Sequence, residues 1–251
     1  MIQPVRDHLL RVAGPHRTPA LNAQLAGLLA LVAGILNSVG FVAVAVYTSH
    51  MTGITATLAD HLVLGGAGVV GTALLALVSF VGGSMVCAWL FNWGRRRGLR
   101  GRYALVLVVE ALLILCFGLL ADRVRWTHDT PLFVAVLCCT MGLQNAIITK
   151  ISGAQIRTTH VTGMITDIGI ELGKLTYVAR TPGLPPVSAD RAKLGLLASL
   201  VMLFFVGGVL GALGYPRFGF VTLVPPALLL LAAAGAPVLA DIRRGWRGRS
   251  G

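Results

Sequence analysis

Charged side chains are scarce in this 251-residue chain, and acidic side chains are the scarcest. Charged residues make up 12% of the sequence and hydrophobic residues 56%, whereas a soluble domain carries about 25% charged residues. Nine residues are Asp or Glu, and long uncharged apolar runs follow one another along the chain. This composition excludes an ordinary soluble domain and predicts an all-α polytopic membrane protein.

Cysteine is also rare and lacks the spacing of a metal site. Cys87, Cys116, Cys138 and Cys139 lie inside apolar segments, and none belongs to a CxxC motif. We interpret them as packing residues and expect no disulfide framework, metal site or cofactor. GxSxG, HExxH and Walker motifs are missing as well, so no enzyme activity is expected.

Six apolar segments are long enough to span a membrane. Each has about 20 residues or more, as a hydrocarbon core of about 30 Å requires. The first is too long for a signal-peptide core, so we expect it to be retained behind a cytoplasmic tail of residues 1–20. The six segments are 21–47, 67–93, 103–121, 131–149, 194–214 and 218–240.

The net charge of +12 comes from basic residues that lie between the apolar runs. Because they do not gather on one amphipathic face, no nucleic-acid partner is predicted. With the N-terminus in the cytoplasm, 18 Lys and Arg residues flank the spans on the cytoplasmic side, against Arg123, Arg125 and Arg217 outside. The positive-inside rule therefore places both termini, including a basic tail of residues 241–251, in the cytoplasm.

One hexapeptide occurs twice, as TSHMTG at 48–53 and TTHVTG at 158–163. GILN (34–37) precedes the first copy, GLQN (142–145) precedes the second, and FVGG occurs at 80–83 and 205–208. These matches predict two membrane repeats, residues 21–121 and 122–240, with three spans each. An odd number of spans inverts one repeat relative to the other, as in many secondary transporters.

Small residues recur at spacings of four in the second span of each repeat. Gly83 and Cys87 form one such pair, and Gly207 and Gly211 form the other. This spacing predicts close helix contacts at corresponding places in the two repeats.

The stretch after each hexapeptide is too short or too charged to span a membrane. The Thr, Ser and Gly residues before it are typical of helix N-caps, which predicts short helices over 53–66 and 163–180. These helices are either re-entrant, with the two hexapeptides meeting near the midplane, or interfacial. In the re-entrant case their N-terminal N–H groups would face a polar or anionic solute.

Polar residues near the hexapeptides form the candidate site. The asparagines among them could equally join neighbouring helices, and the histidines could carry protons or only hold a turn. The candidate solute ligands are Asn37, His50, Thr52, Asn145, His160 and Thr162.

Four acidic residues are candidates for proton or ion coupling. Glu110 stands alone in the apolar run LVLVVEALLIL. An ionisable group inside a span is costly and is by default a functional candidate, although a protonated Glu can also join two helices. The others are Asp60, Asp167 and Glu171.

Two stretches, AGILNSVGF…YTSHMTG and MGLQNAI…TTHVTGMITDIGIELG, resemble the YoaK family of bacterial inner-membrane proteins over roughly residues 25–240. The resemblance implies a multi-pass inner-membrane protein and implies no substrate. The chain departs from the family at Asn37, where relatives usually have an acidic residue, and at Ile54, where they have Asn. If that acid carries a proton in relatives, this chain has lost it.

These observations predict a transporter or channel-like permease for a small polar or anionic solute. Its expected partners are the lipid bilayer and the solute, and a homo-oligomer is left open. One alternative is an intramembrane enzyme that uses His50, His160 and Glu110 for acid–base chemistry. Another is a non-transporting assembly or sensor protein, which would have a sealed apolar core instead of paired polar segments.

Overall fold

The computed structural model describes residues 18–99, 101–123, 130–152, 158–177 and 187–247. All regular structure within these ranges is helical, in eight α-helices and two short 3₁₀ helices. The elements are α2 (Pro19–Val44), α3 (Met51–Leu64), α4 (Ala67–Arg96), α5 (Arg102–Leu120), η1 (Ala121–Arg123), α6 (Thr130–Ser152), α7 (Val161–Thr176), α8 (Arg191–Phe218), η2 (Gly219–Leu223) and α9 (Val224–Arg247).

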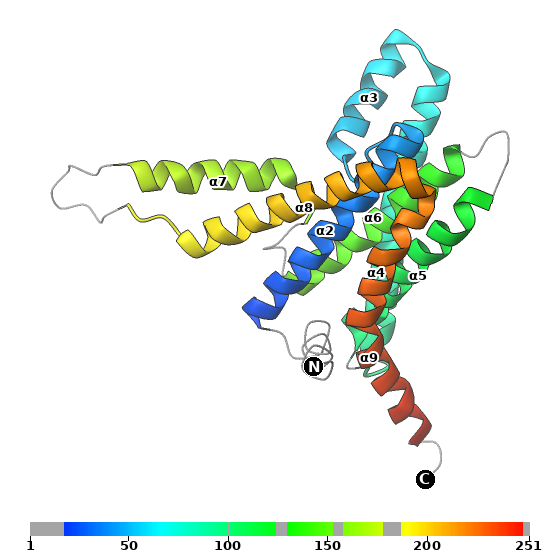
Figure 1. Cartoon of the computed structure of the whole chain (residues 1–251), viewed down its shortest axis with the longest axis vertical. Coiled ribbons are helices and arrows are strands. Elements are labelled where there is room, and N and C mark those ends of the chain that lie inside the picture. The colour runs from blue at the N-terminus through cyan, green and yellow to red at the C-terminus, as the bar shows by residue number, and fades with distance from the viewer. Residues whose placement is uncertain (1–17, 100, 124–129, 153–157, 178–186, 248–251) are drawn as a thin grey trace.

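Five helical stretches among the described residues are long and apolar enough to cross a membrane, so the chain is a helical multi-pass membrane protein. The fifth, Arg191–Gly235, contains α8 and the first half of α9, which the sequence analysis counted as two spans. The two helices follow each other through η2. Gly219 has a left-handed φ of 57° at this point, and the chain changes direction there (Figure 1).

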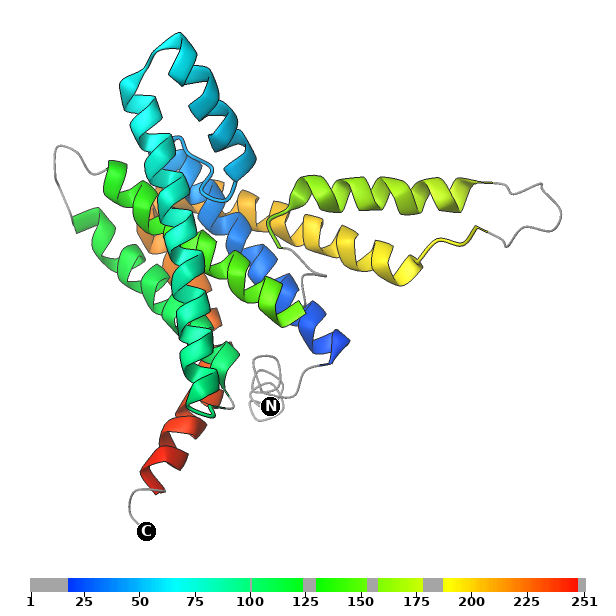
Figure 2. The same cartoon turned by 180° about the vertical axis from the view of Figure 1, so that it is seen from behind.

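The long helices pair across the two halves of the chain. α2 packs along α8, and α6 packs along α4. α5 packs against α9, and α2 also contacts α6 (Figures 1 and 2). The first helix of each half therefore packs against the second long helix of the other half.

Glycine makes these two helix crossings close. A Cβ on Gly34 would overlap the Phe204 carbonyl oxygen, and a Cβ on Gly142 would overlap the Phe80 carbonyl oxygen. Gly83 and Gly207 face the carbonyls of Cys139 and Leu31 in the same way. Cys87 is fully buried and Gly211 is buried, so the close contacts predicted from the small-residue spacing are confirmed.

The two short helices predicted after the hexapeptides are present as α3 and α7. α3 packs against α4 and α7 against α8, so that each pair forms a hairpin. Figure 1 shows that both short helices begin near the middle of the molecule and run outward. The α3–α4 turn contains Gly65 and Gly66, with φ of 87° and 126°, which glycine adopts without strain.

The predicted tails coincide only partly with the described residues. Residues 1–17 of the predicted N-terminal tail lie outside them. α2 begins at Pro19, behind the N-cap Thr18, whose Oγ1 accepts a hydrogen bond from the Leu21 N–H at 3.2 Å. At the other end α9 continues through residue 241 to Arg247, and residues 248–251 lie outside the described ranges.

Candidate functional site

The two hexapeptides, called box 1 (48–53) and box 2 (158–163) below, have the same local structure. Their six positions repeat one pattern of burial, from a buried first threonine to an exposed histidine and an exposed fifth threonine. The first threonines, Thr48 and Thr158, are fully buried. A methyl group of Thr48 packs where a Cβ on Gly40 of α2 would lie. Each box is thus anchored in the core by its first residue.

An asparagine from the preceding long helix holds the second position of each box. Asn37 Oδ1 accepts hydrogen bonds from the Ser49 backbone N–H at 3.0 Å and from the Ser49 hydroxyl at 3.1 Å. In the second half the Thr159 hydroxyl donates a short hydrogen bond to Asn145 Oδ1. Both asparagines therefore fix the box of their own half.

Histidine occupies the N-cap of both short helices. His50 (φ −90°, ψ 63°) and His160 (φ −85°, ψ 57°) have nearly equal backbone angles, and neither side chain makes a capping hydrogen bond. The prediction that Thr, Ser or Gly would cap these helices was therefore wrong. Glycine at the last position of each box leaves room for the histidine, because a Cβ on Gly53 or Gly163 would overlap the imidazole of its own box.

Both boxes line one cavity of about 760 Å³. Its walls include all six side chains that the sequence analysis proposed as solute ligands: Asn37, His50, Thr52, Asn145, His160 and Thr162. The structure thus brings together residues that are more than 100 positions apart in the chain.

The remaining wall residues were not predicted. They are Tyr47, Ser49, Met51, Phe80, Thr149, Thr159, Val161 and Phe204. The sequence held signals for some of them. Ser49 and Thr159 are second residues of the boxes, and Phe80 opens the first FVGG motif. In the second half the residue equivalent to Phe80 is Phe204, one position before the second motif, because Gly83 and Gly207 occupy matching places at the two crossings.

A second cavity of about 400 Å³ lies beside the first, between the end of α2 and the α3–α4 hairpin. Tyr47 and His50 line both cavities. Tyr47 stacks on Phe41 with a ring-centroid distance of 4.3 Å. Ala45, which lies between Phe41 and Tyr47 in the sequence, adopts a left-handed φ of 55°. Such a φ is uncommon for a residue with a side chain. Tyr47, which lines both cavities, therefore follows a left-handed turn residue and stacks on Phe41 of α2.

The four acidic candidates lie outside the wall of the shared cavity. Asp60 is exposed on α3. Asp167 forms an ion pair with Lys193 of α8 at 3.1 Å. Glu110 is fully buried in α5, and neither of its carboxyl oxygens has a hydrogen-bond partner among the described residues.

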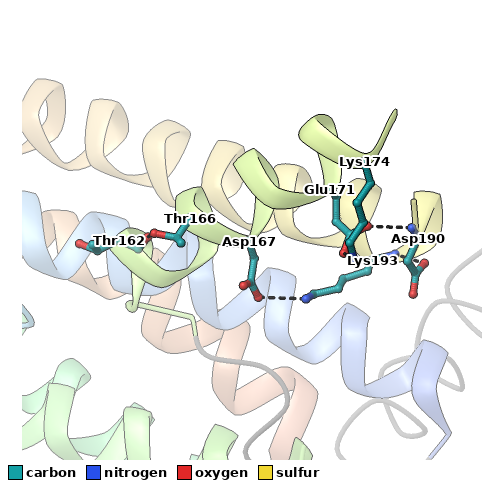
Figure 3. A network of polar contacts seen from close by, with 7 residues as sticks. All are labelled: Thr162, Thr166, Asp167, Glu171, Lys174, Asp190 and Lys193. Carbon is teal, nitrogen blue, oxygen red and sulfur yellow. Dashed lines mark hydrogen bonds and ion pairs between the residues drawn. The ribbon is translucent and has the colours of Figure 1, made fainter. Parts of the chain in front are cut away.

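Glu171 joins α7 to the start of α8. It is 2% exposed, and its carboxylate accepts hydrogen bonds from Lys174 Nζ and from the Asp190 backbone N–H, both at 2.8 Å. These two hydrogen bonds, that of Lys174 first, lower the pKa of Glu171 below its ordinary value. Together with the Asp167–Lys193 pair they fasten the α7–α8 hairpin (Figure 3).

The shared cavity offers hydroxyl, amide and imidazole groups together with two helix N-termini. Among the described residues that line it, none is acidic and none is Lys or Arg. Because the histidine caps leave the first-turn N–H groups of α3 and α7 without side-chain partners, the partial positive charge of both helix ends remains available to a ligand.

Comparison with known proteins places the chain in a family. Neither a curated protein nor a solved structure matches it. A family model matches residues 25–236, which bears out the resemblance to YoaK-like proteins over nearly the same range. The chain therefore belongs to the family described as "Protein of unknown function (DUF1275)".

Proposed function

We propose that this protein is a transporter or channel-like permease for a small polar or anionic solute, and that the shared cavity is its solute site. The single observation that carries the proposal is that box 1 and box 2, from opposite halves of the chain, line one cavity. Transporters built from repeats bind their solute at the repeat interface, next to helices that begin at that interface.

The proposal includes an inverted repeat, which the helix pairing supports. Exchanging the two halves maps the α2–α8 contact onto the α6–α4 contact, and the α3–α4 contact onto the α7–α8 contact. The α5–α9 and α2–α6 contacts map onto themselves. The close glycine crossings obey the same exchange, since Gly34 and Gly142 face Phe204 and Phe80. These contacts are those expected of a repeat related by a two-fold axis, whereas the α4–α5 and α5–α6 contacts have no counterpart of similar extent between α8 and α9 or between α9 and α2.

An inverted repeat also agrees with the positions of the Lys and Arg residues along the chain. Three spans per half would place the boxes on segments that enter from opposite sides of the bacterial inner membrane. The excess of Lys and Arg between the spans then orients both termini toward the cytoplasm. In this arrangement α3 and α7 are re-entrant helices whose starts meet inside the membrane.

Tyr47 and His50 are placed to control access to the site. They line both the shared cavity and the second cavity, so a rotation of either ring would change the passage between the two spaces. The strained turn at Ala45 next to them is the kind of segment that absorbs a local change of conformation. We assign the second cavity as the access route on the box 1 side.

Glu110 is the proposed coupling residue, because Asp167 and Glu171 are engaged at the α7–α8 hairpin and Asp60 is exposed. Glu110→Gln keeps the shape of a neutral glutamic acid and removes its titration. We therefore expect normal folding and loss of the pH dependence of flux. A variant whose flux keeps the wild-type pH profile would remove Glu110 from the mechanism.

The acid–base enzyme that was considered as an alternative needs His50, His160 and Glu110 to converge on one substrate. The two histidines line the shared cavity, whereas Glu110 lies outside its wall. This separation supports transport over catalysis.

A flux assay with thiol blocking tests the proposal. Proteoliposomes would be assayed for entry of urea and of nitrate, with valinomycin and K⁺ balancing the charge. We expect flux above that of protein-free vesicles, and loss of most of it when Thr52→Cys or Thr162→Cys is modified by a bulky methanethiosulfonate. Thr55→Cys is the control, because Thr55 is exposed on α3 outside both cavity walls. Flux that survives modification at both cavity positions would show that solute does not pass through this cavity.

A further inference from the structure

We infer that the shared cavity binds an anion, and that the Asn37 side-chain amide nitrogen, on the box 1 side, is its principal donor. This inference rests on the proposed function, because it takes the shared cavity as the solute site. It adds the charge of the ligand and the half of the site that binds it.

The orientation of the Asn37 amide follows from its partners. Oδ1 accepts from the Ser49 backbone N–H at 3.0 Å. A backbone N–H can only donate, so the atom that faces it must be the amide oxygen, and the amide cannot be flipped. The NH₂ group is then fixed on the other branch of the side chain.

The Asn37 NH₂ group is left for a ligand. Asn37 is 9% exposed and lines the shared cavity. Its hydrogen bonds to described residues are those that Ser49 donates to Oδ1, and Nδ2 has none. Nδ2 is accessible from the cavity, so both of its protons can be donated to a ligand that accepts hydrogen bonds.

Asn145, the equivalent residue of the second half, has fewer free donors among the described residues, because one of its two Nδ2 protons is used within its own helix. Its Nδ2 donates to the Met141 carbonyl at 2.8 Å, and its Oδ1 accepts from the Thr159 hydroxyl. The Thr149 hydroxyl donates to the backbone carbonyl of Asn145 at 2.7 Å. The two asparagines are therefore unequal: both Nδ2 protons of Asn37 are left for a ligand, whereas one Nδ2 proton of Asn145 is.

The surroundings of Asn37 Nδ2 favour a negative charge. The start of α3 brings first-turn N–H groups and the positive end of its dipole to the same cavity. Among the described wall residues there is no carboxylate to repel an anion. The uncapped helix end, the free amide donor and the lack of a carboxylate among the described wall residues act in the same direction, so the ligand is a small anion rather than a neutral solute or a cation.

Thermal stabilisation of the purified protein tests this inference. Acetate would be compared with its neutral analogue acetamide, and nitrate with urea, at constant ionic strength. We expect the anions to raise the melting temperature and the neutral analogues to have little effect. Asn37→Asp keeps an oxygen for Ser49 but replaces the free NH₂ by an oxygen, so the apparent Kd for the anion should rise at least about tenfold.

Thr55→Asp is the control, because it adds the same carboxylate on α3 outside both cavity walls. We expect its response to anions to equal that of wild type. Equal stabilisation of Asn37→Asp and wild type by acetate or nitrate, or equal stabilisation by the anions and their neutral analogues, would overturn the anion site. Anion binding without flux in proteoliposomes would instead contradict the transport proposal and would still support the anion site.

Discussion

At the scale of the residue, four of the six positions of the repeated hexapeptide have separate structural roles. The first threonine is buried, the second residue bonds an asparagine of the preceding helix, and histidine occupies the N-cap position of the short helix. Glycine closes the box because the imidazole occupies the space of its Cβ. The motif is therefore a structural unit as well as a candidate ligand, and its conservation between halves does not depend on solute contact alone.

A glycine substitution tests this account of the box. We expect Gly53→Ala and Gly163→Ala each to lower the free energy of unfolding by about 0.5–1.5 kcal/mol, since the added Cβ forces the exposed imidazole out of its rotamer. Gly169→Ala and Gly173→Ala are the controls, because a Cβ meets nothing within 4 Å at these positions of α7. There the change should be neutral or stabilise by up to about 1 kcal/mol. Thermal unfolding in detergent measures all four, and equal effects in box and control would contradict the packing argument.

At the scale of the element, the two hairpins are fastened differently. In the α3–α4 hairpin His61 Nδ1 lies 3.0 Å from the Gly65 carbonyl oxygen at the turn. In the α7–α8 hairpin two carboxylates, Asp167 and Glu171, bind groups of α8 or its N-cap. The repeat thus keeps the boxes alike while the outer parts of its hairpins diverge.

The Glu171 contacts make the α7–α8 hairpin sensitive to acid. Its pKa is lower in the folded protein than in the unfolded chain, so its stabilising effect is present above the unfolded value of about 4.3 and is lost as the pH falls through the folded value. We expect Glu171→Gln to melt below wild type at pH 7 and the difference to shrink steadily below about pH 4.3. A constant difference between the melting temperatures across that range would refute the assignment.

The helix crossings give a second test at this scale, because each FVGG motif has one glycine in the contact and one outside it. A Cβ on Gly83 or Gly207 would overlap a carbonyl oxygen of the partner helix, whereas one on Gly82 or Gly208 meets nothing within 4 Å. Alanine at either of the first two should therefore cost about 1–3 kcal/mol of unfolding free energy. Alanine at the other two should be tolerated, as chemical denaturation can measure. Sensitivity at Gly82 or Gly208 would mean that the crossing uses another face.

At the scale of the whole molecule, the sequence predicted the helical class, the short helices after the boxes and the close glycine contacts. These follow from local hydropathy and spacing, and they need no knowledge of distant contacts. The exchange of partners, α2 with α8 and α6 with α4, was not predicted, because small residues mark a contact face without naming its partner. The sequence also could not predict that Asn37 and Asn145 make different hydrogen bonds, because both residues occur in matching motifs.

Single and double substitutions of Thr52 and Thr162 test whether the two boxes form one binding site. Both line the shared cavity from opposite halves, so a solute that touches both should couple them. We expect each Thr→Ala change to weaken stabilisation by acetate or nitrate, and the double variant to depart from additivity by over about 1 kcal/mol. Thr52 paired with Thr176 is the control, because Thr176 lies at the far end of α7 and bonds its own helix. The effects of those two substitutions on the anion-induced stabilisation should add within about 0.5 kcal/mol. If the effects of the Thr52 and Thr162 substitutions add strictly in folded protein, the two boxes do not bind the same solute molecule. The repeated hexapeptide would then reflect only the duplication of a three-helix unit.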